Sequence, residues 1–284
     1  AIRGPEVMYP IPFGNVTAAS QKDYPIHWGH FNILGTAVGA QGVAADSDQA
    51  IFPNVNLEVR LGASKGKPGI ASRLPITIPG LGSTDIARKT WPSLAAGAAL
   101  GGVILTVGEN VVGMDEDATI KNGRVVNSPA LAARVNQYND WSDGKYGTVV
   151  IQENVEDRRL GVLEYAIREL GVIAVEMKWG QGAKNIGGEV KIDRLSKARM
   201  LRERGYIVLP DPLDESVAAA FERNAFREFE RHSRLGMVSE EDFARRTEEL
   251  RKAGAKYLFL KTGAYRFADL ARAVLWCSKY GVDV

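Results

Sequence analysis

Short apolar runs alternate with amphipathic segments along the chain from residue 75 onward. The runs GVILTVGEN (102–110), YGTVVIQENVED (146–157) and GVIAVEMKWG (171–180) are rich in β-branched residues, which is typical of strands buried on both faces. Strands that alternate with helices along a chain form parallel sheets with the helices outside. The pattern therefore predicts an α/β fold.

The remaining predicted strands and helices continue this alternation, except in one segment. Further strands are predicted over 75–80, 206–212 and 255–265, helices over 83–101, 128–141, 155–171, 192–205 and 266–281, and a hairpin within 114–128. Helix 83–101 is expected to begin after a Ser83 N-cap, and a Gly C-cap is expected to end helix 155–171. The interruption is 213–254, where amphipathic patterns over 214–236 and 239–254 predict a helical insertion. It is interpreted as an interface or a long connection rather than a lid.

The number of strands limits the fold further. About five βα units precede KYGVDV (279–284), whereas a closed (β/α)8 barrel has eight. Either the chain is not a barrel, or it carries the N-terminal part of one. We expect a partial TIM-barrel type domain over 71–284, preceded by an irregular segment over 1–70 that is rich in Gly, Pro and Asn.

Composition excludes several classes of partner and site. The 36 basic residues nearly balance the 34 acidic ones, so the net charge of +2 gives no field that would attract nucleic acid or an anionic membrane. A lone cysteine, Cys277, cannot form an intrachain disulfide, an iron–sulfur cluster or a structural zinc site, and the three histidines are too scattered to suggest a metal. No apolar run approaches the roughly 18 residues of a membrane span. We expect a cytoplasmic protein.

The predicted strand ends carry the residues that suggest chemistry. In a parallel α/β barrel the functional groups lie at the carboxyl ends of the strands. Lys178 and Lys261 end apolar strands, where a lysine is costly unless it is paired or solvated, and Lys184 follows in the glycine-rich loop. Together they could bind a small anion. The alternative is that each lysine only pairs with a neighbouring carboxylate, such as Glu109 or Glu176.

Three motifs resemble a known family. MKWGQGAK with its following GG (177–188), TVGEN (106–110) and LFLKTG (258–263) are similar to the flavin-binding domain of glutamate synthase and its stand-alone relatives. The resemblance covers about residues 55–284, and the QGAK…GG loop is its specific part. It implies an FMN-binding (β/α)8 barrel that reduces 2-iminoglutarate, formed from 2-oxoglutarate and ammonia, to glutamate.

The resemblance also implies roles for individual residues. The catalytic group would be Lys184, Glu109 and Lys178; the substrate-binding group would be Gln181, Lys184 and Glu189; the cofactor-binding group would be Gly80, Thr106, Gln152, Lys178 and Lys261. Lys261 would lie against the flavin pyrimidine, where a cation stabilises the charge of the reduced ring. No metal is implied, and the cysteines of the family's iron–sulfur cluster are not encoded in this chain.

Departures from the family pattern concern the substrate more than the flavin. Asn185 stands where the family has a proline, Glu189 is acidic where a dicarboxylate is expected, and the N-terminal cysteine nucleophile of the amidotransferase is missing. The implied partners are an electron-donor protein or an NAD(P)H-oxidising subunit, and a second copy or the rest of the barrel. The alternatives are an N-methylglutamate synthase-type activity, a non-catalytic assembly subunit, and a phosphate-sugar barrel enzyme with a Schiff-base lysine at position 178 or 261.

Overall fold

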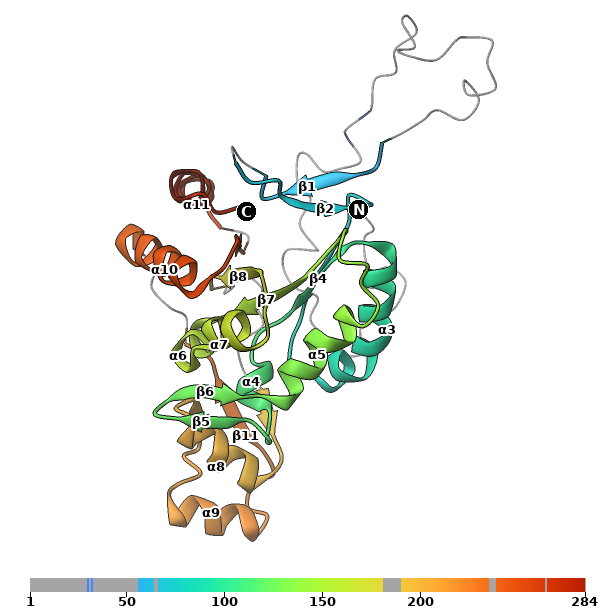
Figure 1. Cartoon of the computed structure of the whole chain (residues 1–284). Coiled ribbons are helices and arrows are strands. Elements are labelled where there is room, and N and C mark those ends of the chain that lie inside the picture. The colour runs from blue at the N-terminus through green and yellow to red at the C-terminus, as the bar shows by residue number, and fades with distance from the viewer. Residues whose placement is uncertain are drawn as a thin grey trace, which may run out of the picture. The chain divides into compact units, whose positions relative to one another are not determined.

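The computed structural model describes residues 30, 32, 56–63, 66–180, 190–234, 239–263 and 265–283 (Figure 1). The chain divides into two compact units, Ala1–Leu57 and Glu58–Val284. The larger unit contains the sheets described below. In the described ranges, no helix is both long enough and apolar enough to cross a membrane.

A parallel sheet forms the centre of the larger unit. Its strands are β3 (Thr77–Leu81), β4 (Ile104–Val107), β7 (Val149–Glu153), β8 (Ala174–Lys178) and β12 (Tyr257–Lys261), and every neighbouring pair is parallel. The order in space, β3-β4-β7-β8-β12, equals the order along the chain. Beyond β12, Asp283 forms a parallel bridge with Phe259. The predicted α/β fold is confirmed, and neighbouring strands of the sheet are also consecutive strands of this sheet along the chain.

Helices pack on one face of this sheet. They are α3 (Asp85–Gly101), α5 (Pro129–Asn139), α7 (Val162–Glu169), α10 (Glu240–Ala253) and α11 (Phe267–Tyr280). The main core lies beneath them, where Leu105 and Ile151 of the sheet join Trp91, Leu163 and Phe243 of the helices in one buried cluster. Because side chains alternate across a strand, every second residue of β4 and β7 faces this core.

The opposite face of the sheet changes from apolar to polar along the strands. Ile104, Val150 and Ala174 form a second buried cluster with Ile70 of β2 (Ile70–Ser72), which pairs with β1 (Val59–Leu61). Two residues further along these three strands, the same face carries Thr106, Gln152 and Glu176. The hairpin therefore lies against the apolar end of this face, and the polar side chains lie toward the carboxyl ends.

A small antiparallel sheet corrects two of the predictions. It has the order β10 (Ile207–Leu209), β11 (Phe229–His232), β9 (Val190–Ile192) and lies next to α8 (Leu195–Glu203) and α9 (Glu215–Glu222). The strand predicted over 206–212 therefore belongs to a separate sheet. The helix predicted over 214–236 is wrong over residues 223–234, because Asn224 adopts a left-handed conformation (φ 60°) and the chain then alternates, with Phe229 and Arg231 buried. Its last two residues, 235 and 236, lie outside the described residues.

Other boundaries differ in smaller ways. The helix predicted over 155–171 is two helices, α6 (Val155–Leu160) and α7, separated by Gly161 with φ 71°. Thr84 rather than Ser83 caps α3, because its hydroxyl accepts a hydrogen bond from the Ala87 amide (3.2 Å). The predicted hairpin is confirmed as β5 (Thr119–Lys121) and β6 (Arg124–Asn127), and a one-turn helix, α4 (Val111–Met114), follows β4 without having been predicted.

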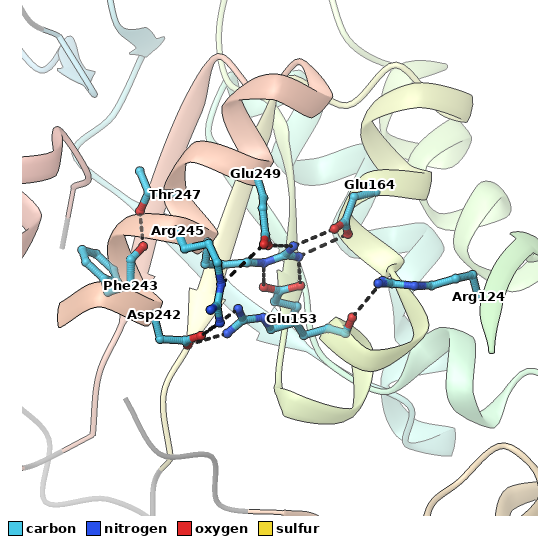
Figure 2. A network of polar contacts seen from close by, with 10 residues as sticks. Arg124, Glu153, Glu164, Asp242, Phe243, Arg245, Thr247 and Glu249 are labelled. Carbon is cyan, nitrogen blue, oxygen red and sulfur yellow. Dashed lines mark hydrogen bonds and ion pairs between the residues drawn. The ribbon is translucent and has the colours of Figure 1, made fainter. Parts of the chain in front are cut away.

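A buried ion-pair network joins α10 to the sheet (Figure 2). Arg246 donates to both carboxylate oxygens of Glu153 at the end of β7 (2.9 and 2.6 Å) and to both of Glu164 on α7 (2.6 and 3.2 Å). The side chains of Arg246 and Glu153 are each 4% exposed. Nearby, Arg158 makes two hydrogen bonds to Asp242 (2.7 and 3.2 Å). The start of α10 is therefore held by charge as well as by apolar contact.

We predict that Arg246→Ala lowers the free energy of unfolding by about 3–5 kcal/mol, because it leaves the Glu153 carboxylate buried without its cation. Urea denaturation measures this. The control is Lys252→Ala on the same helix, which breaks an exposed pair with Glu248 (2.7 Å) and should change stability by less than about 0.5 kcal/mol. Equal effects of the two substitutions would contradict the proposed role of the buried pair.

Candidate functional site

The candidate site lies on the polar face, at the carboxyl ends of neighbouring strands. Gln152 of β7 lies opposite Glu176 of β8, and Lys178 of β8 lies opposite Lys261 of β12. Glu109 follows β4 in the next loop. The parallel register thus brings together residues that are more than 150 positions apart, since the carboxyl ends of parallel strands share one edge of the sheet.

Lys178 forms an ion pair with Glu109. Their side chains are 13% and 24% exposed, respectively. Burial tends to raise the pKa of Glu109, but the charge and hydrogen bond of Lys178 outweigh burial, and the charge of Lys261 adds to them, so this pKa lies below its usual value. The interpretation that a strand-end lysine pairs with a neighbouring carboxylate is confirmed for Lys178.

Lys261 is in a different position. It lies beside Lys178 in the register, and none of the described carboxylates comes within ion-pairing distance of it. Like charges on directly opposite residues of two strands repel each other. Glu109 is paired with Lys178, and burial disfavours the charge of Glu176, so Lys261 is the cation at this edge that has no ion-pair partner within the described ranges.

One side-chain atom of Gln152 has no hydrogen-bond partner in the described ranges. Its side-chain amide donates to Glu176, while its Oε1 is buried and accepts no hydrogen bond within the described ranges. Burial raises the pKa of Glu176, against the opposing effects of Gln152 and the two lysines. A buried amide oxygen without a donor is costly. The site therefore presents an acceptor as well as a cation.

Glycines bring the ends of β3 and β4 close to Gln152. A Cβ added to Gly80 would lie 2.9 Å from Nε2 of Gln152 and 3.1 Å from the Cα of Gly108. A Cβ added to Gly108 would lie 2.6 Å from the amide nitrogen of Gly82. Thr106, which is 5% exposed, precedes these contacts on β4. Side chains at either glycine would push the strand ends apart.

A second group of residues, not anticipated from the sequence, holds the loop that carries Glu109. The Asn110 amide donates to Oδ2 of Asp157 (2.9 Å), and Nδ2 of Asn154 donates to Oδ1 of Asn110 (3.2 Å). Asn110 has φ 64°, a conformation that asparagine tolerates better than most residues. The one available signal was the capping box from Asn154 to Asp157, which the helix prediction passed over.

Asp157 is held in an environment that disfavours its charge. Burial raises its pKa to about 7; the backbone hydrogen bonds from Asn110 and Asn154 oppose this, and the nearby charges of Glu109 and Glu153 add to it. Its Oδ1 is buried and accepts no hydrogen bond in the part of the chain that the structure describes.

Part of the predicted site cannot be placed. Gln181, Lys184 and Glu189 lie in 181–189, outside the described residues. Of the other predicted site residues, the structure brings Glu109, Lys178 and Lys261 together at one edge, and places Gly80 of β3 close to the side chain of Gln152 on β7, with β4 between the two strands. Among the described residues there is no group of three or more His, Cys, Asp or Glu side chains that could hold a metal ion.

Comparison with known proteins gives no relative. No protein-family model, curated protein or solved structure matches this chain.

We predict that the stability contribution of Asp157 depends on pH. Its pKa rises from 3.8 to about 7 on folding, so between these values the folded chain keeps a proton that the unfolded chain releases. Stability from this group therefore falls as pH rises through that window. Asp157→Asn removes the titration and keeps an acceptor for the Asn110 amide. From about pH 5 to about pH 8, its urea midpoint should rise relative to that of the wild type.

The matched control for this prediction is Asp117→Asn, on the surface of the same unit. Its difference from the wild type should stay flat over the same range. A flat difference for Asp157→Asn as well would mean that Asp157 is ionised throughout in the folded protein.

The glycine contact gives a separate prediction. Gly80→Ala should destabilise the protein by about 1–3 kcal/mol, because its Cβ would press against the Gln152 amide and the Gly108 backbone. Gly97→Ala, within α3 and with nothing within 4 Å of the added Cβ, should instead stabilise it by about 0.5–1 kcal/mol. Thermal or urea unfolding of the two variants decides this; a harmless Gly80→Ala would show that the strand ends can separate.

Proposed function

We propose that this chain is the N-terminal part of an FMN-dependent, glutamate-synthase-like oxidoreductase built on a (β/α)8 barrel. The observation that carries the proposal is the alignment of Gln152, Lys178 and Lys261 along the carboxyl ends of successive parallel strands, with one lysine paired and the other not paired within the described ranges. Lys178 and Lys261 lie in the sequence motifs MKWGQGAK and LFLKTG, and the third motif, TVGEN, lies at the carboxyl end of β4.

Two features of the sheet support the barrel. The strands are parallel and follow one another in chain order, which is the arrangement of a barrel rather than of a doubly wound sheet, where the order reverses. The bridge between Asp283 and Phe259 adds a sixth parallel position in the same direction. Barrel closure would require further strands that continue from this edge.

The residues present suit a flavin. The unpartnered Oε1 of Gln152 calls for a buried N–H donor, and the pyrimidine part of a flavin carries an N–H group between two carbonyls. Lys261 would stabilise negative charge on that ring, and Gly80 and Gly108 let the ends of β3 and β4 lie close to Gln152. Bound FMN would supply hydride transfer.

The substrate would be an imine of a 2-oxo dicarboxylic acid. Lys178 would contribute positive charge near the carboxylates, oriented by its pairing with Glu109. Lys184, Gln181 and Glu189 are proposed to contact the substrate from the loop after β8. Electrons would come from a donor protein or an NAD(P)H-oxidising subunit, and the open edge of the sheet would be covered by the rest of the barrel or by a second copy.

A flavin titration tests the proposal. The full-length protein should take up FMN and show flavin absorbance bands; Lys261→Met should weaken binding roughly 10- to 100-fold, which corresponds to the loss of one interaction with a charged group. Lys256→Met, exposed and preceding the same strand, is the control and should bind FMN normally. Absence of FMN binding by the wild type would refute the proposal.

The substrate is tested on the reduced, FMN-loaded protein. Reoxidation by 2-oxoglutarate with ammonia, and formation of glutamate, is the expected result. Reoxidation only with methylamine, and formation of N-methylglutamate, would assign the alternative activity instead.

A further inference from the structure

Arg231 is a buried cation on the inner side of the small sheet. It lies in the middle strand, β11, between Val208 of β10 and Val190 of β9. The residue is 3% exposed, and Phe229, two positions earlier on the same face of the strand, belongs to the main core. The guanidinium therefore points into the protein rather than toward solvent.

Its N–H groups have no acceptor within the described ranges. Nε and Nη1 are buried and make no hydrogen bond to any described residue. The guanidinium carbon of Arg231 lies 5.3 Å from the centroid of the Tyr206 ring. This cation–π contact involves the face of the guanidinium and leaves the donors at its edges unused. A buried charge in this state calls for an anion.

Two carboxylates near Tyr206, Glu156 and Asp157, do not pair with Arg231. Glu156 and Asp157 both act on the ionisation of Tyr206, as Arg231 does with the opposite sign. Glu156, however, accepts hydrogen bonds from Arg159 (3.1 Å) and from Arg234 (2.8 and 3.0 Å). Neither carboxylate forms an ion pair with Arg231.

Asp157 is a poor counter-ion for a second reason. One of its oxygens accepts the Asn110 amide, and burial raises its pKa to about 7, which is the opposite of what a close arginine would do. The described part of the chain therefore surrounds the guanidinium of Arg231 with groups that do not neutralise it.

We propose that Arg231 anchors a binding site for a small oxyanion, a carboxylate or a phosphate group, beside the loop that follows β4. Tyr206, on which the guanidinium stacks, donates from its hydroxyl to Oδ1 of Asn110 (3.4 Å), next to Glu109. The site is built on the small sheet, whereas the lysines at the ends of β8 and β12 belong to the main sheet. Its existence does not depend on flavin binding.

Calorimetric titration of the full-length protein tests this, with inorganic phosphate, glutarate and 2-oxoglutarate as ligands at constant ionic strength. At least one of them should bind saturably, and the contrast between phosphate and the two carboxylates identifies the class of ligand. Arg231→Met should weaken that binding at least about tenfold. Lys191→Met, which removes the same charge from an exposed position on neighbouring β9, should leave it unchanged.

Thermal unfolding without ligand separates this role from a structural one. A buried cation without a partner in the protein lowers the stability of the ligand-free protein. Arg231→Met and Arg231→Gln should therefore melt at the wild-type temperature or above. Clear destabilisation of both variants, or no saturable binding of any of the three anions by the wild type, would overturn the proposal. Flavin absorbance, measured in the same samples, distinguishes the anion site at Arg231 from the proposed FMN-dependent function. Anion binding without FMN uptake would refute the proposed oxidoreductase function and leave the anion site standing.

Discussion

Burial of Glu153 at the end of β7 requires a cation, and Arg246 supplies it from 93 residues further along the chain. This pair brings α10 back to the sheet after the chain has left it to form the small sheet and α9. Because α10 leads directly into β12, the position of β12 beside β8 depends on the return of α10. The placement of Lys261 in the candidate site follows from an ion pair on the other face of the sheet.

Gln152 and Glu153 have different roles because successive side chains of a strand point to opposite faces of the sheet. They are consecutive and both are buried, yet one faces the polar side of the sheet and the other faces the helices. The carboxylate on the helix side is fully engaged by Arg246, as expected for a structural group. The amide on the other side keeps an acceptor without a donor in the described ranges. Of these two neighbours, the one with an unsatisfied atom lies on the face on which we propose that ligand binds.

The sequence predicts the parallel sheet well because its strands are buried on both faces and therefore read as continuous apolar runs. It fails between residues 223 and 234, where AFREFERH carries charges that suit an amphipathic helix as well as a strand. Burial decides between them: Phe229 packs against Phe221 and Phe226, at centroid distances of 4.9 and 5.1 Å, and this requires β11. The lysines of the site could be anticipated from their costly positions, whereas the only sequence signal for Asp157 is its capping box with Asn154, and an aspartate in a first helical turn is ordinary.

The break at Gly161 has a consequence for how this chain can change over time. It separates α6, whose first turn holds the Asn110 loop, from α7, whose side chains fill the core. A continuous helix would couple the two, so that any insertion near the loop would rotate every core residue behind it. With the break, the short segment from Asn154 to Leu160 can vary in length and chemistry while the packing of α7 stays in register. Diversification of this edge of the sheet is thereby made largely independent of folding.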